Sequence, residues 1–173
     1  MRSSHALPWT LGLSLALFGG GCHQTYGRPI VEGAPPDPIE AALNDMRDGR
    51  RPLADLEVVY DDMHGLYGGE TITVRGDGTI EVVRRDPPQE ATTSTAPVTS
   101  DQLQGIVELL LDIAAWWQEV PERTMLPDES RARLAVRCTG AESSIWEFYN
   151  ELEGLDRIVR VRDYVEGLLP AAR

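Results

Sequence analysis

Two acidic side chains and one histidine stand close together in a glycine-rich segment, and they are the chain's best candidates for metal chemistry. Asp61, Asp62 and His64 lie within four residues. Carboxylate and imidazole groups bind divalent metals, but no further ligand follows at a fixed spacing. Asp61 and Asp62 also diverge in an extended segment, because neighbouring side chains alternate. We therefore expect a solvated acidic loop over residues 61–69; a loop that responds to a metal or small ligand is the alternative.

The residues needed for catalysis are scarce. Of the three histidines, His5 and His23 precede the expected domain, which leaves His64. A Ser-His-Asp or Cys-His arrangement would have to be built on that side chain, and the sequence has no Gly-x-Ser-x-Gly motif. Glycines are frequent over residues 65–78, but a strand pattern follows them, whereas a phosphate-binding loop precedes a helix. The sequence favours a protein that is not an enzyme, and it indicates no cofactor.

The N-terminus carries the pattern of an export signal. Arg2 is the only charged residue before Cys22, and an apolar run over residues 7–18 and three glycines separate the two. A basic start, a short apolar run and small residues are typical of a secretory signal peptide, here residues 1–21. A retained membrane helix is disfavoured, because a span takes about 20 apolar residues.

The residues around Cys22 indicate how the exported chain is held. Leu-Phe-Gly-Gly-Gly-Cys at residues 17–22 resembles the cleavage box of bacterial lipoproteins, whose cysteine is acylated and becomes the first mature residue. The resemblance implies lipid on Cys22, attachment to a membrane, and a place in the cell envelope, at the outer membrane facing the periplasm. Simple secretion with a free Cys22 is the alternative. With lipid on Cys22, the second cysteine, Cys138, has no disulfide partner, and we expect it to be buried.

The charge balance disfavours one class of partner. Without Arg2, 15 arginines remain against 28 acidic residues, a net charge of −13, and the chain has no lysine. Such a domain is repelled by nucleic acid and by anionic lipid, so we expect no nucleic-acid partner and assign the anchoring to the acyl group.

A single domain should follow a short tether. Residues 22–36 are rich in Gly and Pro and predict a flexible link to the lipid, and residues 37–170 predict the domain. Its first helix should begin at the Asp37-Pro38 cap and end at Gly49.

The next elements are a strand and a hairpin. Alternating apolar residues predict a strand at residues 55–60, then hairpin arms at 71–75 and 79–83. Matching side chains across the hairpin places Val74 opposite Ile80 and leaves a Gly-Asp-Gly loop, in which a glycine takes the left-handed position. The polar residues 86–97 predict an excursion over the surface.

A long helix and a second hairpin come next. Thr99 and Gln102 form the signature of a capping box, and an apolar stripe predicts a helix over residues 100–117. In the second hairpin, facing Val136 to Trp146 in the core leaves a three-residue loop, Gly140 to Glu142.

The last segment completes an α+β pattern. Residues 156–169 suit a helix, which we favour, although residues 158–162 also alternate like a strand. Hairpins give antiparallel strand pairs, and helices with an apolar stripe must cover one side of them. We therefore predict an α+β fold, an antiparallel sheet built from β-hairpins with helices packed on one face.

One stretch has a family likeness. Residues 70–80, Glu-Thr-Ile-Thr-Val-Arg-Gly-Asp-Gly-Thr-Ile, resemble a hairpin signature, roughly apolar-x-apolar-x-x-Asp-Gly-x-apolar, of a family of small bacterial lipoprotein domains of unknown function. In that family a helix, a second hairpin and a terminal helix follow, an order that matches residues 55–169 here. The resemblance implies the fold and the lipidated address, and no activity.

A contact surface is the favoured functional feature. Trp116, Arg133, Arg137 and Tyr149 are of the residue types that dominate protein interfaces, and we expect them at the margin of the long helix or outward on the second hairpin. Trp116 folding under the following loop, and Arg137 pairing with acidic neighbours, are the alternatives. The sequence thus predicts a lipid-anchored envelope protein that binds or inhibits another envelope protein.

Overall fold

The computed structural model describes residues 35–64, 66–118, 124, 129–148 and 156–169. The expected signal peptide, Cys22, most of the tether and Tyr149 lie outside the described residues. None of the helices in the described part is both long and apolar enough to cross a membrane.

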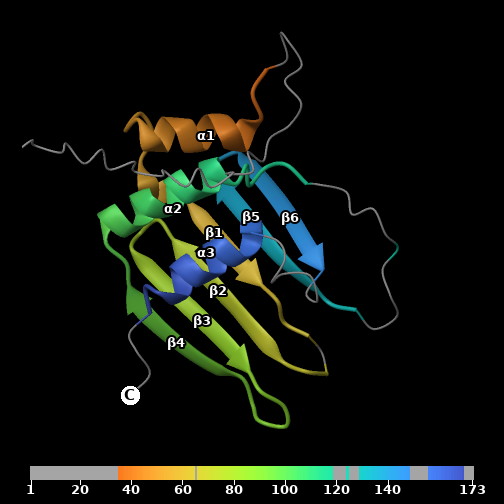
Figure 1. Cartoon of the computed structure of the whole chain (residues 1–173). Coiled ribbons are helices and arrows are strands. Elements are labelled where there is room, and N and C mark those ends of the chain that lie inside the picture. Colours follow the sequence, from red (N-terminus) through yellow and green to blue (C-terminus); the bar gives the residue numbers. More distant parts are fainter. Residues whose placement is uncertain (1–34, 65, 119–123, 125–128, 149–155, 170–173) are drawn as a thin grey trace, which may run out of the picture.

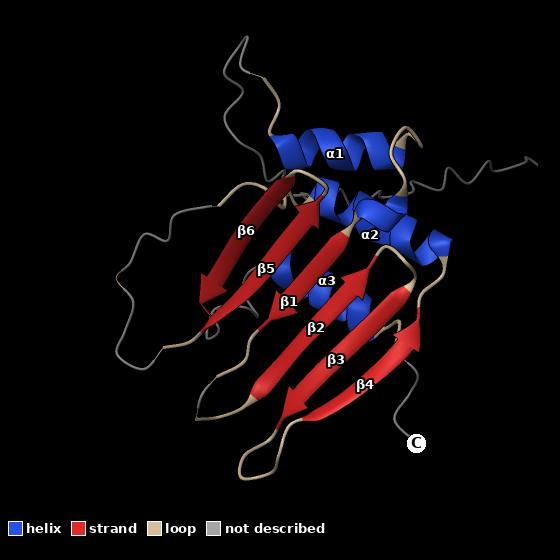
Figure 2. Cartoon of the chain, turned by 180° about the vertical axis from the view of Figure 1, so that it is seen from behind, coloured by secondary structure: helices blue, strands red, loops and turns tan. Residues whose placement is uncertain are grey.

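Three helices cover one face of a six-stranded antiparallel sheet (Figure 1), and the view from behind shows the strands without helices in front of them (Figure 2). The spatial strand order is β4-β3-β2-β1-β5-β6. The predicted α+β fold is confirmed. The elements, in chain order, are α1 (Pro38–Arg47), the short 3-10 helix η1 (Leu53–Asp55), β1 (Glu57–Asp61), β2 (Gly69–Arg75), β3 (Thr79–Arg85), β4 (Thr92–Pro97), α2 (Ser100–Asp112), β5 (Arg131–Cys138), β6 (Ala141–Phe148) and α3 (Asp156–Glu166).

The first helix begins and ends where its sequence predicts. Asp37 Oδ1 accepts a hydrogen bond from the Ile39 N–H at 2.8 Å, and Pro38 occupies the first turn. Gly49 follows the helix with φ +74°, a conformation that glycine adopts without steric cost. The helix buries the predicted apolar side chains: Ile39, Ala42, Leu43 and Met46.

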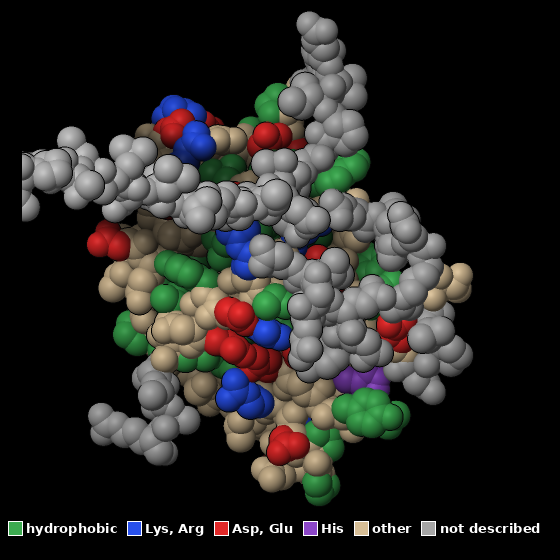
Figure 3. Space-filling model, viewed as in Figure 1, with side chains coloured by type: hydrophobic (Ala, Val, Ile, Leu, Met, Phe, Trp, Pro, Cys, Tyr) green, Lys and Arg blue, Asp and Glu red, His purple; other side chains and the backbone are tan. Residues whose placement is uncertain are grey.

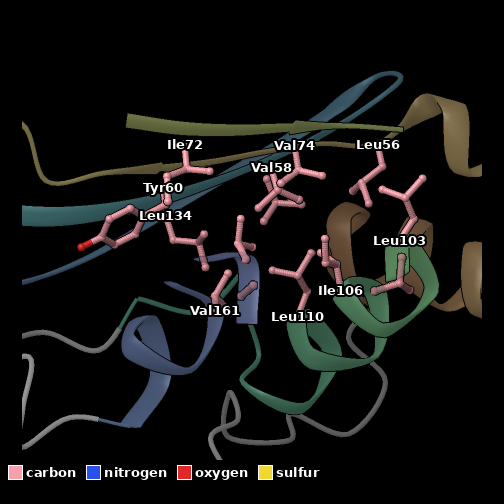
Figure 4. Close-up of a cluster of buried hydrophobic side chains, with 14 of the residues drawn as sticks. Leu56, Val58, Tyr60, Ile72, Val74, Leu103, Ile106, Leu110, Leu134 and Val161 are labelled. Carbon is pink, nitrogen blue, oxygen red and sulfur yellow. The ribbon is translucent and has the colours of Figure 1, made fainter. Parts of the chain in front are cut away.

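The core fills the space between the sheet and the helices, as Figure 4 shows for Val58, Val74, Ile106, Leu110 and Val161. At one end of this cluster Tyr60 turns its hydroxyl away from the apolar side chains (Figure 4). Cys138 is free and buried, as predicted, and burial raises the pKa of its thiol.

The register of the first hairpin is confirmed. Val74 pairs with Ile80 and Ile72 with Val82, and Gly78 takes the left-handed position with φ +90°. The prediction for residues 86–97 is wrong in part, because residues 92–97 form β4 at the edge of the sheet. Threonine favours strands, but β4 buries only Ala96 and has no alternation of hydrophobic residues. Its sequence therefore has the polar pattern of a loop, which is why the strand was not predicted.

The long helix is shorter than predicted. The capping box of Thr99 and Gln102 is present, but α2 ends at Asp112 and not at residue 117. Ala114 has φ +50°, which breaks the helix without a glycine. The buried Arg157 of α3 donates hydrogen bonds to the carbonyl oxygens of Ile113, Ala114 and Trp117 at 3.1, 3.0 and 2.7 Å. A side chain 40 to 44 residues away thus binds the carbonyl groups that directly follow α2.

The predicted register of the second hairpin is wrong. Leu134 pairs with Ile145, and Arg133 with Trp146, around a two-residue turn. Ile145 therefore points into the core, and Trp146 lies on the opposite face of the sheet. A shift in register by one residue exchanges the two faces of a strand. The terminal segment forms a helix, as favoured, which buries Ile158, Val161 and Val165.

Candidate functional site

The two aspartates of the 61–69 loop, which the sequence predicts to be solvated, point to opposite sides of the sheet, and Asp62 is buried. Asp61 ends β1 on the face without helices, where its Oδ1 accepts hydrogen bonds from Met63 N and Thr71 Oγ1, both at 3.1 Å. Asp62 is buried: Oδ2 accepts from the Tyr60 hydroxyl at 2.8 Å, and Oδ1 accepts from Glu70 N at 2.7 Å. Both carboxylates therefore hold the ends of β1 and β2 together.

His64 is also engaged in the structure of its loop. Its Nδ1 accepts hydrogen bonds from the N–H groups of Leu66 and Tyr67 at 3.1 and 3.2 Å, and its ring stacks on Tyr67 with 4.8 Å between centroids. The turn exposes Leu66 and Tyr67 by 71% and 77%. Within the described residues, no three His, Cys, Asp or Glu side chains are arranged to hold a metal ion.

The predicted contact residues have different environments. Trp116 is half-buried and packs against the core. Arg137 is exposed and forms ion pairs with Glu57 at 2.8 Å and with Glu142 at 3.1 Å. Arg133 is exposed on the helix-free face, where Asp61 and Trp146 are its neighbours across the strands. Of the three predicted contact residues that the structure describes, Arg133 and Arg137 share one surface, and Trp116 lies elsewhere.

An aromatic cluster that the sequence interpretation missed lies on the same face. The Arg131 guanidinium stacks on Trp146, with Cζ 3.9 Å from the ring centroid, and it lies 5.9 Å from the Phe148 ring. The two rings meet edge to face at 5.2 Å. A cation over an aromatic ring contributes about 0.5–1 kcal/mol at exposed sites, and more where water is excluded. The wrong register hid this cluster, because it had turned both aromatic residues toward the core.

Charged side chains form a row across five strands of the helix-free face, toward the end of the sheet near α1. Glu57 stands in the middle, between Arg137 of β5 and Arg75 of β2, which lies 3.9 Å from it. Glu142 of β6 and Glu81 of β3 extend the row on either side through Arg137 and Arg75. The two flanking carboxylates raise the pKa of Arg137. These ion pairs orient side chains on a solvent-exposed surface, where each adds little stability.

The helix-free face differs in charge from the molecule as a whole. By the alternation of the six strands, five arginines and four carboxylates point to this side, whereas the whole chain has a net charge of −12. Between the charged row and the aromatic cluster the side chains are small or neutral. The helix-free face carries Arg75, Arg85, Arg131, Arg133, Arg137, Glu57, Asp61, Glu81 and Glu142 as its charges, and Val59, Thr71, Thr73, Ala135 and Ser144 between them.

A second polar cluster lies on the helix side, where the core ends beneath α3; Figure 3 shows acidic and basic side chains gathered on this side. Arg84 Nη2 lies 2.5 Å from Glu70 Oε2, and this hydrogen bond raises the pKa of Arg84. The neighbouring Glu70 carboxyl, with partial desolvation, raises the pKa of Glu166 of α3 to about 7, although the Glu166 side chain is largely exposed. Burial and the bond to Asp62 raise the pKa of Tyr60. The cluster joins α3 to the sheet.

The chain matches no known protein family and no curated protein.

Proposed function

We propose that this chain is a lipid-anchored protein of the bacterial cell envelope whose domain binds another envelope protein through the helix-free face of its sheet. Lipid on Cys22 would hold it to the outer membrane on the periplasmic side, and residues 22–36 would act as the tether. The small-ligand alternative, built on residues 61–69, gains no support, because both aspartates and the His64 imidazole are engaged within the fold.

One observation carries the proposal: on a strongly acidic chain, the helix-free face alternates arginines with carboxylates and holds an ordered Arg131–Trp146 stack. Arginine and tryptophan are enriched among the residues that contribute most binding energy at protein interfaces. Charges of both signs at fixed positions favour a partner with a complementary pattern and disfavour others. Because its arginines balance its carboxylates, the helix-free face would repel an acidic partner less than the rest of this acidic chain would.

Site-specific photo-crosslinking in the native host tests the proposal. A photoreactive residue at Ser144, exposed among the charges of the helix-free face, should capture a defined envelope protein. The same residue at Glu108, exposed on α2, is the matched control and should capture that protein much less. If Glu108 captures the partner and Ser144 does not, the helix side is the binding surface and the proposal is wrong.

A binding measurement with the recovered partner follows. Trp146→Ala and Arg131→Ala should each weaken the affinity by roughly tenfold or more, as interface anchors do. His64→Ala should leave it unchanged, because the His64 ring serves its own loop. Loss of binding in His64→Ala with full binding in Trp146→Ala would instead support the ligand-loop alternative.

A further inference from the structure

The two edge strands of the sheet, β6 and β4, differ in the contacts that their outward-facing backbone groups make. At β6, the side-chain amide of Gln118 makes two hydrogen bonds with the backbone of Trp146, donating to its oxygen at 3.1 Å and accepting from its N–H at 2.7 Å. Ser143 Oγ donates to Ala115 O at 3.1 Å, which fixes the same segment beside the strand. This edge is occupied by the chain itself, in the way that native proteins cover an edge strand.

At the other edge, no described residue covers β4 in this way over most of its length. Residues 92–95, Thr-Thr-Ser-Thr, are exposed and uncharged. Edge strands are usually protected by charges, prolines or bulges, and here the first proline, Pro97, comes only at the end. The pairing of β4 with β3 runs without a break from Thr92 to Pro97.

The register shows which backbone groups of β4 are free to pair. The Val98 N–H donates to Gly78 O at 2.8 Å, two residues beyond the pair of Ala96 with Ile80. Hydrogen-bonded pairs alternate along an antiparallel ladder, so residues 92, 94 and 96 also direct their backbone groups at β3. Thr93 and Thr95 therefore turn both their N–H and C=O groups away from the sheet.

We propose that β4 pairs antiparallel with β4 of a second copy of this chain, with the two-fold axis at Ser94. Thr93 then lies opposite the second copy's Thr95, and both residues offer an N–H and a C=O. Each copy exchanges the same bonds, as a two-fold interface requires. Threonine pairs across strands stabilise an antiparallel ladder, and the two sheets become one.

The register of β4 favours a second copy, because Thr93 and Thr95 of one strand match Thr95 and Thr93 of an antiparallel copy. Two copies of an acidic chain repel each other, and β4 is a six-residue stretch without charge through which they can approach. One strand pair buries less area than the roughly 1,600 Å² of a standard stable interface. The dimer is therefore weak in solution, and its formation on a membrane, which rests on the proposed lipid anchor, depends on the high local concentration that a shared anchor would provide.

Cysteine crosslinking of the full-length protein in host membranes tests this pairing. Because the two-fold axis passes through Ser94, the Ser94 residues of the two copies face each other as a non-hydrogen-bonded pair. Their Cα atoms are then about 4.5 Å apart, a distance that a disulfide can span. Under mild oxidation with copper phenanthroline, Ser94→Cys should give at least about tenfold more dimer than Thr93→Cys. In the proposed register Thr93 lies opposite Thr95 of the second copy, so the two Thr93→Cys side chains are not paired with each other. The unsubstituted chain, in which Cys138 is buried, sets the background.

A substitution at Thr95 separates backbone pairing from mere proximity. In the Ser94→Cys protein, Thr95→Pro removes an N–H that points away from β3, so the fold should persist while the crosslink falls to background. Thr95→Val keeps the N–H and should keep the crosslink. Raising the salt concentration should increase the yield, because it screens like charges. A folded Ser94→Cys protein that yields no dimer, or that crosslinks to a different protein, overturns the proposal.

Discussion

At the residue scale, β6 places adjacent side chains in opposite environments. Ile145 is 1% exposed and lies in the core opposite Leu134, whereas Trp146 is half-buried on the helix-free face beneath Arg131. Ile145→Ala should therefore lower the free energy of unfolding by about 2–5 kcal/mol, the cost of deleting a buried aliphatic side chain. Trp146→Ala should cost less than about 2 kcal/mol, since it leaves the main core intact. Urea unfolding of both variants measures the difference, and the reverse order would contradict the register.

The Glu70–Glu166 pair gives a second prediction at this scale. The folded-state pKa of Glu166 is raised from 4.5 to about 7, so its contribution to stability is full below pH 4.5 and is lost as the pH rises through 7. Arg162 lowers this pKa, and Asp163 raises it further. Glu166→Gln should reduce the gain in stability between pH 8 and pH 5, measured by urea unfolding at both values. Glu108→Gln, at an exposed site on α2, is the control and should keep the gain.

At the element scale, the end of α2 depends on a side chain from α3. Arg157→Met should cost about 2–4 kcal/mol, because it leaves up to three partly buried carbonyl groups without this donor. Arg160→Met, on the same helix, removes an ion pair with the exposed Asp112 and should cost about 1 kcal/mol or less. Thermal or urea unfolding compares the two variants. An equal cost would show that Arg157 does not hold the end of α2.

A local sequence signal predicts a helix or hairpin correctly when the interactions that set its bounds lie within that helix or hairpin. The cap at Asp37, the capping box at Thr99 and the parity of the first hairpin all act within a few residues, and the structure has each of them. The end of α2 depends on Arg157, which no local pattern indicates. In β6, apolar residues occupy both faces of the strand. The sequence interpretation placed the larger side chain, Trp146, in the core, whereas the structure buries its smaller neighbour Ile145 there.

The candidate site was predictable only in part, for the same reason. Arg133 and Arg137 are assigned correctly to the outward face, because the alternation of β5 is clean. The Arg131–Trp146 stack depends on the pairing of two strands, and the Glu70–Glu166 contact depends on how α3 lies on the sheet. Neither follows from spacing along the chain. In the structure a two-residue turn, Thr139–Gly140, closes this hairpin, and Gly140 has φ +83°, a conformation that glycine adopts without steric cost.

At the scale of the whole molecule, the net charge bears on how the proposed membrane attachment would work. Residues 22–173 have a net charge of −13, which disfavours electrostatic binding to anionic lipid. The described helices offer no membrane span. The proposed attachment would depend on acyl chains on Cys22, each buried methylene of which contributes about 0.8 kcal/mol.

The anchor is tested by metabolic labelling with a fatty acid in cells. The protein should incorporate the label, and Cys22→Ala should abolish incorporation and leave the chain as a precursor or release it from membranes. Cys138→Ala is the matched control, because Cys138 is buried within the domain and should not affect labelling. Equal labelling of the Cys22→Ala protein would contradict the lipid anchor. A released chain should also lose its dimer, since the weak β4 pairing relies on copies that share one membrane surface. Persistence of the Ser94→Cys crosslink in the released form would mean that the pairing is stronger than one strand pair provides.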